Sequence, residues 1–292
     1  QHAVLTTKHH NGFCLWPTKT TEYCVRNSPW KNGKGDVLRE FSEAARKHGL
    51  GVGFYFSAAD ANVCCMSTPD PIGKRRLIGN VNKYFPIAKE QLREILLNYG
   101  SLDEVWFDGA LDPFGVDVIQ SDGKPIGTKY WDELTALVRK LQPNAVIMGG
   151  TYPDMRWPGN ENGVASYPLW YVVEKGQEKA NWVPPGANGW LVPEADVPPR
   201  GAWFWLPDSD KNLFTLEHLC EIYNKSIGYG ANILINLTPD RSGLIPDMEM
   251  RRMAEFGEEI RRRFGKPLAE TNSENHWDEN ATLKIELPKP SL

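Results

Sequence analysis

The stretch from residue 51 to residue 107 contains one strand–helix–strand repeat. It opens with Gly51-Val52-Gly53-Phe54-Tyr55-Phe56, an aromatic and apolar run that is typical of a buried strand. Apolar residues then recur at helical spacing from about Asn82 to Tyr99, and Val105-Trp106-Phe107 is the next short apolar run. Strands joined by a crossover helix run parallel, so this stretch predicts a parallel α/β sheet.

The same alternation extends to both sides of this repeat. Asp36 is a candidate N-cap for a helix that Gly49 ends. Further strands are predicted at residues 3–7, 145–148, 202–206 and 233–237. Further helices are predicted at residues 130–141, 215–227 and 247–264. Residues 151–200 are rich in Pro, Gly, Asn and Trp, which indicates long loops around short strands.

This order predicts an α/β fold of the (β/α)8 or TIM-barrel type that lacks its first strand. Seven strands are expected when the six ranges above are counted with a short strand within residues 151–200. No glycine-rich phosphate-binding fingerprint follows any of the six, which argues against a doubly wound dinucleotide fold. Residues 281–287 alternate polar and apolar side chains with a period of two. We therefore expect a catalytic barrel over residues 1–266, incomplete at its N-terminus. Residues 267–292 are expected to form a linker and the first strand of a β-sandwich domain.

Composition excludes several classes of function. The 292 residues carry a formal net charge of -4 with no long basic run, so a nucleic-acid partner is not expected. No apolar stretch approaches the roughly 20 residues that span a bilayer. The five cysteines lack zinc-ligand spacing and are interpreted as free or buried thiols; they are Cys14, Cys24, Cys64, Cys65 and Cys220. Eleven Trp residues suit a sugar-binding cleft, but on their number alone a role in the core is the stronger interpretation.

Functional residues of such barrels lie at the carboxyl-terminal ends of the strands. Asp108 directly follows the apolar run 105–107, so its side chain is expected at the barrel mouth. A residue that only caps a helix or satisfies loop amides fits that position equally well. The same rule selects a further set of candidates: His9, His10, Tyr55, Arg156, Glu161, Trp203, Trp205 and Asn236.

The adjacent histidines His9 and His10 admit more than one interpretation. They could belong to an ordered loop or form half of a metal site. Neighbouring residues of a strand point to opposite faces, and no carboxylate lies within reach in the sequence, so no metal is expected. As hydrogen-bonding groups at a barrel mouth they suit the recognition of sugar hydroxyls.

Hydrolysis of a glycoside requires two carboxyl groups, which stand about 5–5.5 Å apart in retaining enzymes. Glu161 is the best partner for Asp108, because it lies in a Gly- and Pro-bearing loop after the next strand. Taken alone, Glu161 is more simply interpreted as a surface glutamate. Glu174 and Glu194 are the next candidates for the acid.

Several blocks of sequence resemble glycoside hydrolase family 29, the α-L-fucosidases. The first is Lys8-His9-His10-Asn11-Gly12-Phe13, which resembles the family's Lys-His-His-Asp-Gly-Phe. Blocks in the family's order follow at residues 27–30, 105–109, 156–161 and 234–241. The resemblance covers nearly the whole chain. Gly159-Asn160-Glu161 looks like the branch that prefers α-1,3/1,4-linked fucose.

This resemblance implies a retaining exo-α-L-fucosidase that acts on fucosylated glycans without a cofactor or metal. Asp108 would be the nucleophile, and Glu161 the acid and then the base. The implied substrate-binding residues are His9, His10, Tyr55, Trp106, Arg156 and Trp203, with Trp205 as an alternative to Trp203 against the C5 methyl group of fucose. A secreted, periplasmic or lysosome-like location is expected from the family.

The chain also departs from the family pattern. The family's His-Trp-Gly element at the end of the first strand is absent, and Asn11 stands where Asp is usual. Two alternatives to the fucosidase therefore remain open. One is a fucose-binding or inactive barrel fragment, and the other is a retaining glycosidase for another sugar such as an α-galactoside.

Overall fold

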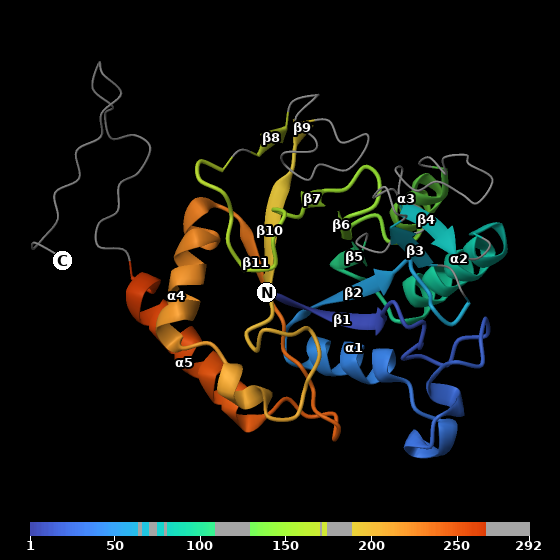
Figure 1. The fold of residues 1–292 in the computed structure, drawn as a ribbon, viewed down its shortest axis with the longest axis horizontal. Helices are drawn as coiled ribbons and strands as arrows, with labels where there is room; N and C mark the ends of the chain where they lie inside the picture. Colours follow the sequence, from blue (N-terminus) through green and yellow to red (C-terminus); the bar gives the residue numbers. More distant parts are fainter. Residues whose placement is uncertain are drawn as a thin grey trace, which may run out of the picture. The chain divides into compact units, whose positions relative to one another are not determined.

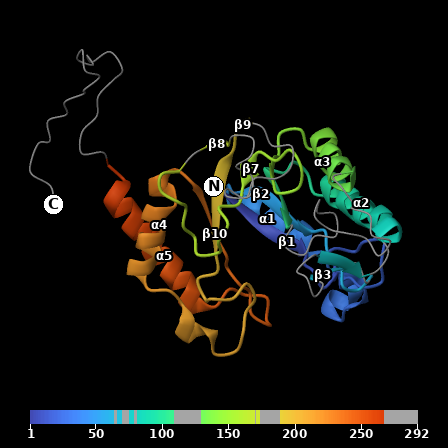
Figure 2. The same ribbon diagram turned by 45° about the horizontal axis from the view of Figure 1, so that its top comes forward.

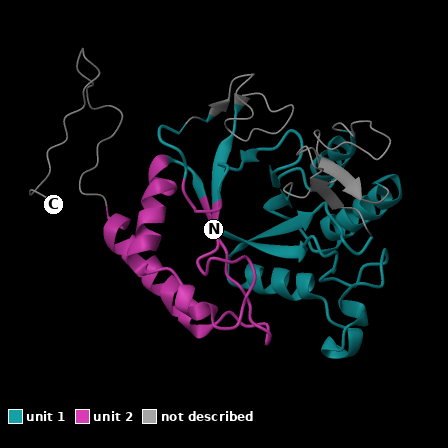
Figure 3. Cartoon of the chain, viewed as in Figure 1, with its two compact units in different colours: residues 1–160, 165–195, 230–232 teal, residues 161–164, 196–229, 233–292 magenta. Residues whose placement is uncertain are grey.

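The computed structural model of the chain separates into two compact units (Figure 3). It describes residues 1–63, 66–69, 75–78, 81–108, 129–169, 171–173 and 189–266. Unit 1 comprises residues 1–160, 165–195 and 230–232, and unit 2 comprises residues 161–164, 196–229 and 233–292. Cys64, Cys65, Glu174 and the predicted β-sandwich segment 267–292 lie outside the described residues.

A seven-stranded sheet is the centre of the fold. Its strand order is β1-β2-β5-β6-β7-β10-β11. The bounds are His2–Lys8 (β1), Gly51–Ser57 (β2), Glu104–Asp108 (β5), Val146–Met148 (β6), Met155–Arg156 (β7), Val192–Val197 (β10) and Asn232–Ile235 (β11). Neighbours from β1 to β10 pair in parallel, and β1, β2 and β5 lie side by side in Figure 1. The parallel α/β fold that the sequence predicts is therefore confirmed.

Alternation along β2 and β5 separates the core from the site. Phe54, Phe56, Val105 and Phe107 are fully or almost fully buried in one hydrophobic core. In this core they pack with side chains of three α-helices of unit 1: Val37–Lys47 (α1), Val81–Asn98 (α2) and Lys129–Leu141 (α3). The residues between them in the strands point to the opposite face of the sheet. That face carries the candidate site.

The predicted helices of unit 1 are confirmed. Asp36 caps α1 by accepting a hydrogen bond from the backbone N–H of Arg39, and Gly49 follows with a φ of 72°. The buried side chains of α1 are Leu38, Ser42 and Ala45. Helices α2 and α3 run alongside each other in both views (Figures 1 and 2).

The predicted strand at residues 202–206 is wrong. The strand of this region is β10, Val192–Val197, within the stretch that sequence reasoning interpreted as long loops around short strands. Pro198 and Pro199 follow it directly, and a proline lacks the N–H that a strand ladder requires. Gly201 then adopts a φ of 72°. The chain therefore turns before Trp203, and Trp203 and Trp205 do not share a strand face.

Unit 2 contains the helices Leu216–Lys225 (α4) and Asp247–Phe264 (α5), which pack against each other. Thr215 caps α4 through the backbone N–H of His218. The buried side chains Leu219, Cys220 and Phe256 form the core of this unit. Arg200, 1% exposed, donates to the buried carboxylate of Glu249 at 2.6 Å. Both long helices that the sequence predicts here are confirmed.

The remaining elements are short. Two antiparallel pairs are Met66–Pro69 (β3) with Arg75–Ile78 (β4), and Val172–Val173 (β8) with Gly189–Trp190 (β9). The 3-10 helices are Val25–Asn27, Trp30–Gly33, Ser209–Asn212 and Ile227–Tyr229. Among the described residues, no helix is both long and apolar enough to span a bilayer. Three of the five cysteines are described, and Cys14, Cys24 and Cys220 are buried free thiols, as predicted.

Candidate active site

Asp108 is the last residue of β5, at the carboxyl-terminal end of the sheet. Its register partner on β2 is Ser57, also a terminal residue. The Asp108 side chain is 15% exposed, so it is open to a small ligand without being fully solvated. Asp108 therefore lies at a strand end, as its place directly after the apolar run 105–107 indicates.

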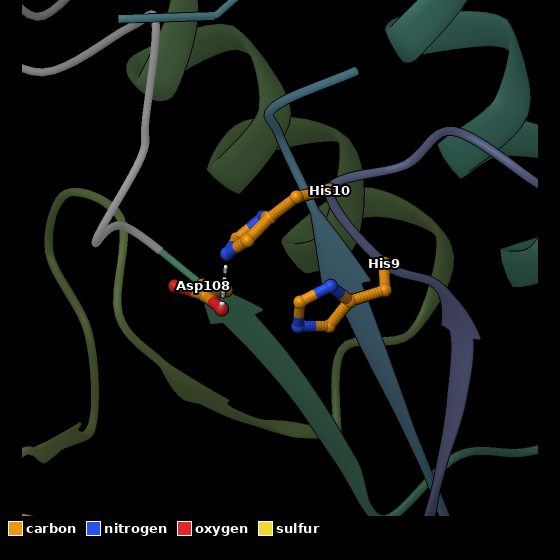
Figure 4. Close-up of side chains that lie close together, drawn as sticks. All are labelled: His9, His10 and Asp108. Carbon is orange, nitrogen blue, oxygen red and sulfur yellow. Dashed lines mark ion pairs between the residues drawn. The ribbon is translucent and has the colours of Figure 1, made fainter. Parts of the chain in front are cut away.

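Two groups contact the same oxygen of this carboxylate. The Tyr55 hydroxyl donates a hydrogen bond to Asp108 Oδ2. His10 Nε2 lies 3.3 Å from that oxygen (Figure 4). On its other side, His10 Nδ1 lies 2.6 Å from Ser57 Oγ. A neutral imidazole serves both contacts when Nε2–H faces Asp108 and Nδ1 accepts from Ser57.

Three rings form a stack beside the carboxylate. The His9 ring is parallel to that of Tyr55, with 5.6 Å between centroids and 4° between planes. Tyr55 stacks in turn on Trp106, at 5.4 Å and 21°. Trp106 Nε1 donates to Glu194 Oε1 at 3.1 Å, which fixes the indole edge. The stack therefore holds Tyr55 in place for its hydrogen bond to Asp108.

Both histidines reach the site, contrary to the expectation for neighbouring strand residues. Strand β1 ends at Lys8, so His9 and His10 lie in the turn that follows, and alternation no longer applies. Their ring centroids are 4.1 Å apart, and Figure 4 shows both rings on the side of Asp108.

Burial sets the protonation of these groups. It lowers the pKa of His9 to about 4, assisted by the nearby His10 and opposed by Asp108. Burial also lowers the pKa of His10, again against the charge of Asp108. The pKa of Tyr55 is raised, first by burial and then by Asp108. Near neutral pH the two imidazoles are therefore uncharged and the Tyr55 phenol keeps its proton.

A buried lysine anchors the turn that carries the histidines. Lys8 Nζ donates to Asp60 Oδ2 at 3.2 Å, to the Tyr84 hydroxyl at 2.6 Å and to Gln91 Oε1 at 3.0 Å. Gly12, with a φ of 85°, lies so close to Asp60 that an added Cβ would be 2.1 Å from Oδ1. The Lys-His-His-Asn-Gly segment is therefore fixed to α2 and to the loop after β2.

The same residues could also hold a metal ion. One nitrogen or oxygen atom from each of His9, His10 and Asp108 lies within 4.8 Å of the others. Sequence reasoning found no carboxylate near the two histidines because it considered only neighbours in the chain. The parallel pairing of β1, β2 and β5 brings Asp108 to them from about a hundred residues away.

Arg156 is placed differently from the expected loop. It ends the short strand β7, where it is paired in register with Pro193 of β10. The side chain is 4% exposed, and burial lowers the pKa of its guanidinium. A buried guanidinium is a strong hydrogen-bond donor, and its role toward a sugar remains a prediction.

Unit 2 contains the second predicted carboxylate. Glu161 is exposed, and its Oε2 accepts a hydrogen bond from Trp203 Nε1 at 3.0 Å. The Trp203 backbone carbonyl in turn accepts from Asn236 Nδ2 at 3.0 Å. Three residues that the sequence places in separate strand-end segments, Glu161, Trp203 and Asn236, therefore meet within one unit.

Sequence reasoning did not predict the contacts that three residues make at this site. It named no role for Ser57, included Lys8 only as part of a motif and considered Glu194 only as a substitute acid. The strand-end rule that selected Asp108 applies equally to Ser57. Lys8 and Glu194 act through contacts with distant segments, so no local pattern in the sequence could have found them.

Known proteins resemble the chain over most of its length. A sequence model of the family described as α-L-fucosidase matches residues 1–263. Alpha-L-fucosidase 1 of Arabidopsis thaliana is 34% identical over 275 residues, which cover 91% of this chain and 50% of that protein. The chain thus spans about half the length of this curated relative.

Solved structures give the same result. A glycoside hydrolase 29 family member from an unknown rumen bacterium superposes with a TM-score of 0.75 at 31% identity, over 94% of this chain and 49% of that one. A Ruminococcus gnavus GH29 fucosidase, solved in complex with fucose, superposes with a TM-score of 0.72 at 28% identity, over 92% and 56%.

Proposed function

Because the chain belongs to the α-L-fucosidase family, glycoside hydrolase family 29, we propose that it releases terminal L-fucose from glycans by a retaining double displacement. The observation that carries this proposal is the Asp108 carboxylate at the end of β5, contacted by Tyr55 and His10. The choice of fucose as the sugar rests on the family relationship, and the choice of Asp108 as the nucleophile rests on the position of its carboxylate.

In the first step an Asp108 oxygen attacks the anomeric carbon of fucose. The bond from that carbon to the glycosidic oxygen breaks, and the departing oxygen takes a proton from the Glu161 carboxyl group. The products are a fucosyl ester of Asp108 and the free acceptor sugar. In the second step Glu161 removes a proton from water, the water oxygen bonds to the anomeric carbon, and the ester bond breaks.

The groups around Asp108 suit this role. The Tyr55 hydroxyl donates to the carboxylate and keeps its proton, so it can hold the nucleophile in one orientation through the reaction. Neutral His9 and His10 can donate and accept hydrogen bonds, as sugar hydroxyls require. Trp106, at the end of the stack and partly exposed, can offer an apolar ring face to a sugar.

The roles of the remaining residues follow from the family blocks. Trp203 packs beside Glu161 in unit 2 and is proposed to face the C5 methyl group of fucose. Arg156 is proposed to bind the sugar near the reacting carbon. The Gly159-Asn160-Glu161 block supports a preference for α-1,3/1,4-linked fucose on branched glycans.

Substitution of the acid tests the proposal. Glu161→Ala should retain hydrolysis of aryl α-L-fucosides with good leaving groups, which need no proton, and lose hydrolysis of fucosylated oligosaccharides. Glu217→Ala, an exposed glutamate on α4 of the same unit, is the matched control and should hydrolyse both. If Glu161→Ala hydrolysed both substrates at the normal rate, another residue would have to be the acid. Faster hydrolysis of aryl galactosides than of aryl fucosides would reject fucose as the substrate.

A further inference from the structure

A second cluster of ionisable groups lies on the same sheet, toward the opposite end of its strands. His2 opens β1, Glu104 opens β5, and Glu194 lies within β10. One nitrogen or oxygen atom from each of the three lies within 4.8 Å of the others. All three side chains belong to unit 1, and regular strands hold all three.

The two carboxylates of this cluster are buried. Glu104 is 0% exposed and Glu194 is 2% exposed, whereas the His2 side chain is 32% exposed. Glu104 Oε2 is hydrogen-bonded to His2 Nε2. The other oxygen, Glu104 Oε1, is buried and has no hydrogen-bond partner within the described part of the chain.

One carboxylate oxygen of this cluster is therefore buried without a hydrogen bond among the described residues. A buried carboxylate oxygen is costly when nothing replaces the water that it loses. A dication that contacts both carboxylates would give Glu104 Oε1 a partner.

We propose that His2, Glu104 and Glu194 form a binding site for a divalent transition-metal cation such as Zn²⁺. One imidazole nitrogen with two carboxylate oxygens is a ligand set that Zn²⁺ accepts, whereas Mg²⁺ and Ca²⁺ favour oxygen ligands alone. Ligand distances of about 2.0–2.2 Å require the three groups to separate slightly around the ion. The partly exposed side of His2 leaves room for water as a further ligand.

Glu194 connects this site to the candidate active site. The hydrogen bond from Trp106 Nε1 to Glu194 Oε1 would orient the carboxylate toward the ion, as outer contacts do for metal ligands. Trp106 also stacks on Tyr55, so a bound ion would stiffen the support of Asp108 without touching the substrate. The metal-site proposal does not depend on the fucosidase reaction, because its test measures metal binding and not turnover.

Zinc binding to the whole chain tests the proposal. Because His9, His10 and Asp108 could bind zinc too, calorimetric titrations with Zn²⁺ should be made in the His10→Ala background. We expect one zinc ion per chain there, and at least about tenfold weaker binding after the further change His2→Ala or Glu104→Gln. His48→Ala, an exposed histidine at the end of α1, is the matched control and should leave zinc binding unchanged.

Thermal unfolding gives a second readout. Saturating Zn²⁺ should raise the unfolding temperature of the His10→Ala chain, since a ligand that binds only the folded state stabilises it, and His2→Ala should abolish that rise. Far-UV circular dichroism would establish that each variant is folded, and the half-exposed His2 is the safer site to change. Zinc affinity that His2→Ala leaves unchanged in the His10→Ala background, or zinc binding that disappears with His10→Ala alone, would overturn the proposal.

Discussion

Strand β5 carries a carboxylate at each end: Glu104 at its amino-terminal end and Asp108 at its carboxyl-terminal end. Both side chains point to the same face of the sheet. His2 of β1 contacts Glu104, and His10, in the turn after β1, contacts Asp108. They differ in how their charge is satisfied. Asp108 is partly exposed and held by Tyr55 and His10, whereas Glu104 is fully buried and one of its oxygens has no hydrogen-bond partner among the residues that the structure describes.

This contrast separates a carboxylate that is open to a substrate from one that is buried with another carboxylate beside it. At the carboxyl-terminal end, the nearby buried Lys8 is matched by Asp60, Tyr84 and Gln91, one acceptor for each of its three donors. A reactive carboxylate there can stay charged and accessible. At the amino-terminal end Glu104 and Glu194 are both buried beside His2, which favours a cation over a neutral sugar.

The largest expected difference is in kcat, when each of the two carboxylates of β5 is replaced by its amide. Asp108→Asn removes the nucleophile, so kcat for an aryl α-L-fucoside should fall by roughly 10⁴-fold or more. Glu104→Gln should change kcat by less than about tenfold, because Glu104 reaches the site only through its neighbours. Steady-state rates of the two variants, compared at equal folded concentration, check the prediction. Equal losses in both would remove the distinction between the two ends.

The hydrogen bond from Tyr55 offers a sharper test of the carboxyl-terminal end. Tyr55→Phe keeps the ring stack but removes the donor to Asp108, so kcat should fall by about 10- to 100-fold, as expected for one bond to a charged group. Tyr99→Phe is the matched control, because Tyr99 also donates to an aspartate, Asp36, at 3.1 Å. The comparison fails if both variants keep full activity or if both lose it.

A smaller effect is expected in the pH dependence of stability. The pKa of His9 is about 4 in the folded chain and ordinarily 6.5, so between these values the unfolded chain binds more protons. The folded state should therefore lose stability as the pH falls from 6.5 toward 4. His9→Gln should weaken this dependence in thermal unfolding measured over that range, and the exposed His48→Gln should not. If the unfolding temperature changed with pH in the same way for the unchanged chain, His9→Gln and His48→Gln, burial of His9 could not be the cause of the pH dependence.

Regular periodicity made most of the fold predictable from the sequence. The helices α1 to α5 and the strands β1, β2, β5, β6 and β11 lie close to their expected positions, because each is one run of a single period bounded by caps or turns. Strand β10 was missed because Pro and Gly around it indicate a loop, although only Pro198 and Pro199, beyond its end, break the ladder.

The candidate site was predictable in part. Asp108, Tyr55 and His10 were found because strand ends meet at one edge of a parallel sheet, and the structure brings these three together. The hydrogen bonds of Lys8 to α2 and of Trp106 to Glu194 depend on tertiary packing, and the sequence carries no local sign of them. The joint action of Asp108 and Glu161 stays a prediction.

Covalent trapping tests the central claim most directly. The chain should be incubated with a 2-deoxy-2-fluoro fucosyl donor that carries a good leaving group, digested, and its peptides sequenced by mass spectrometry. We expect one fluorofucosyl group on the peptide that contains Asp108, and no label on the Asp108→Asn chain. A label carried by any other residue would contradict the assignment of Asp108 as the nucleophile.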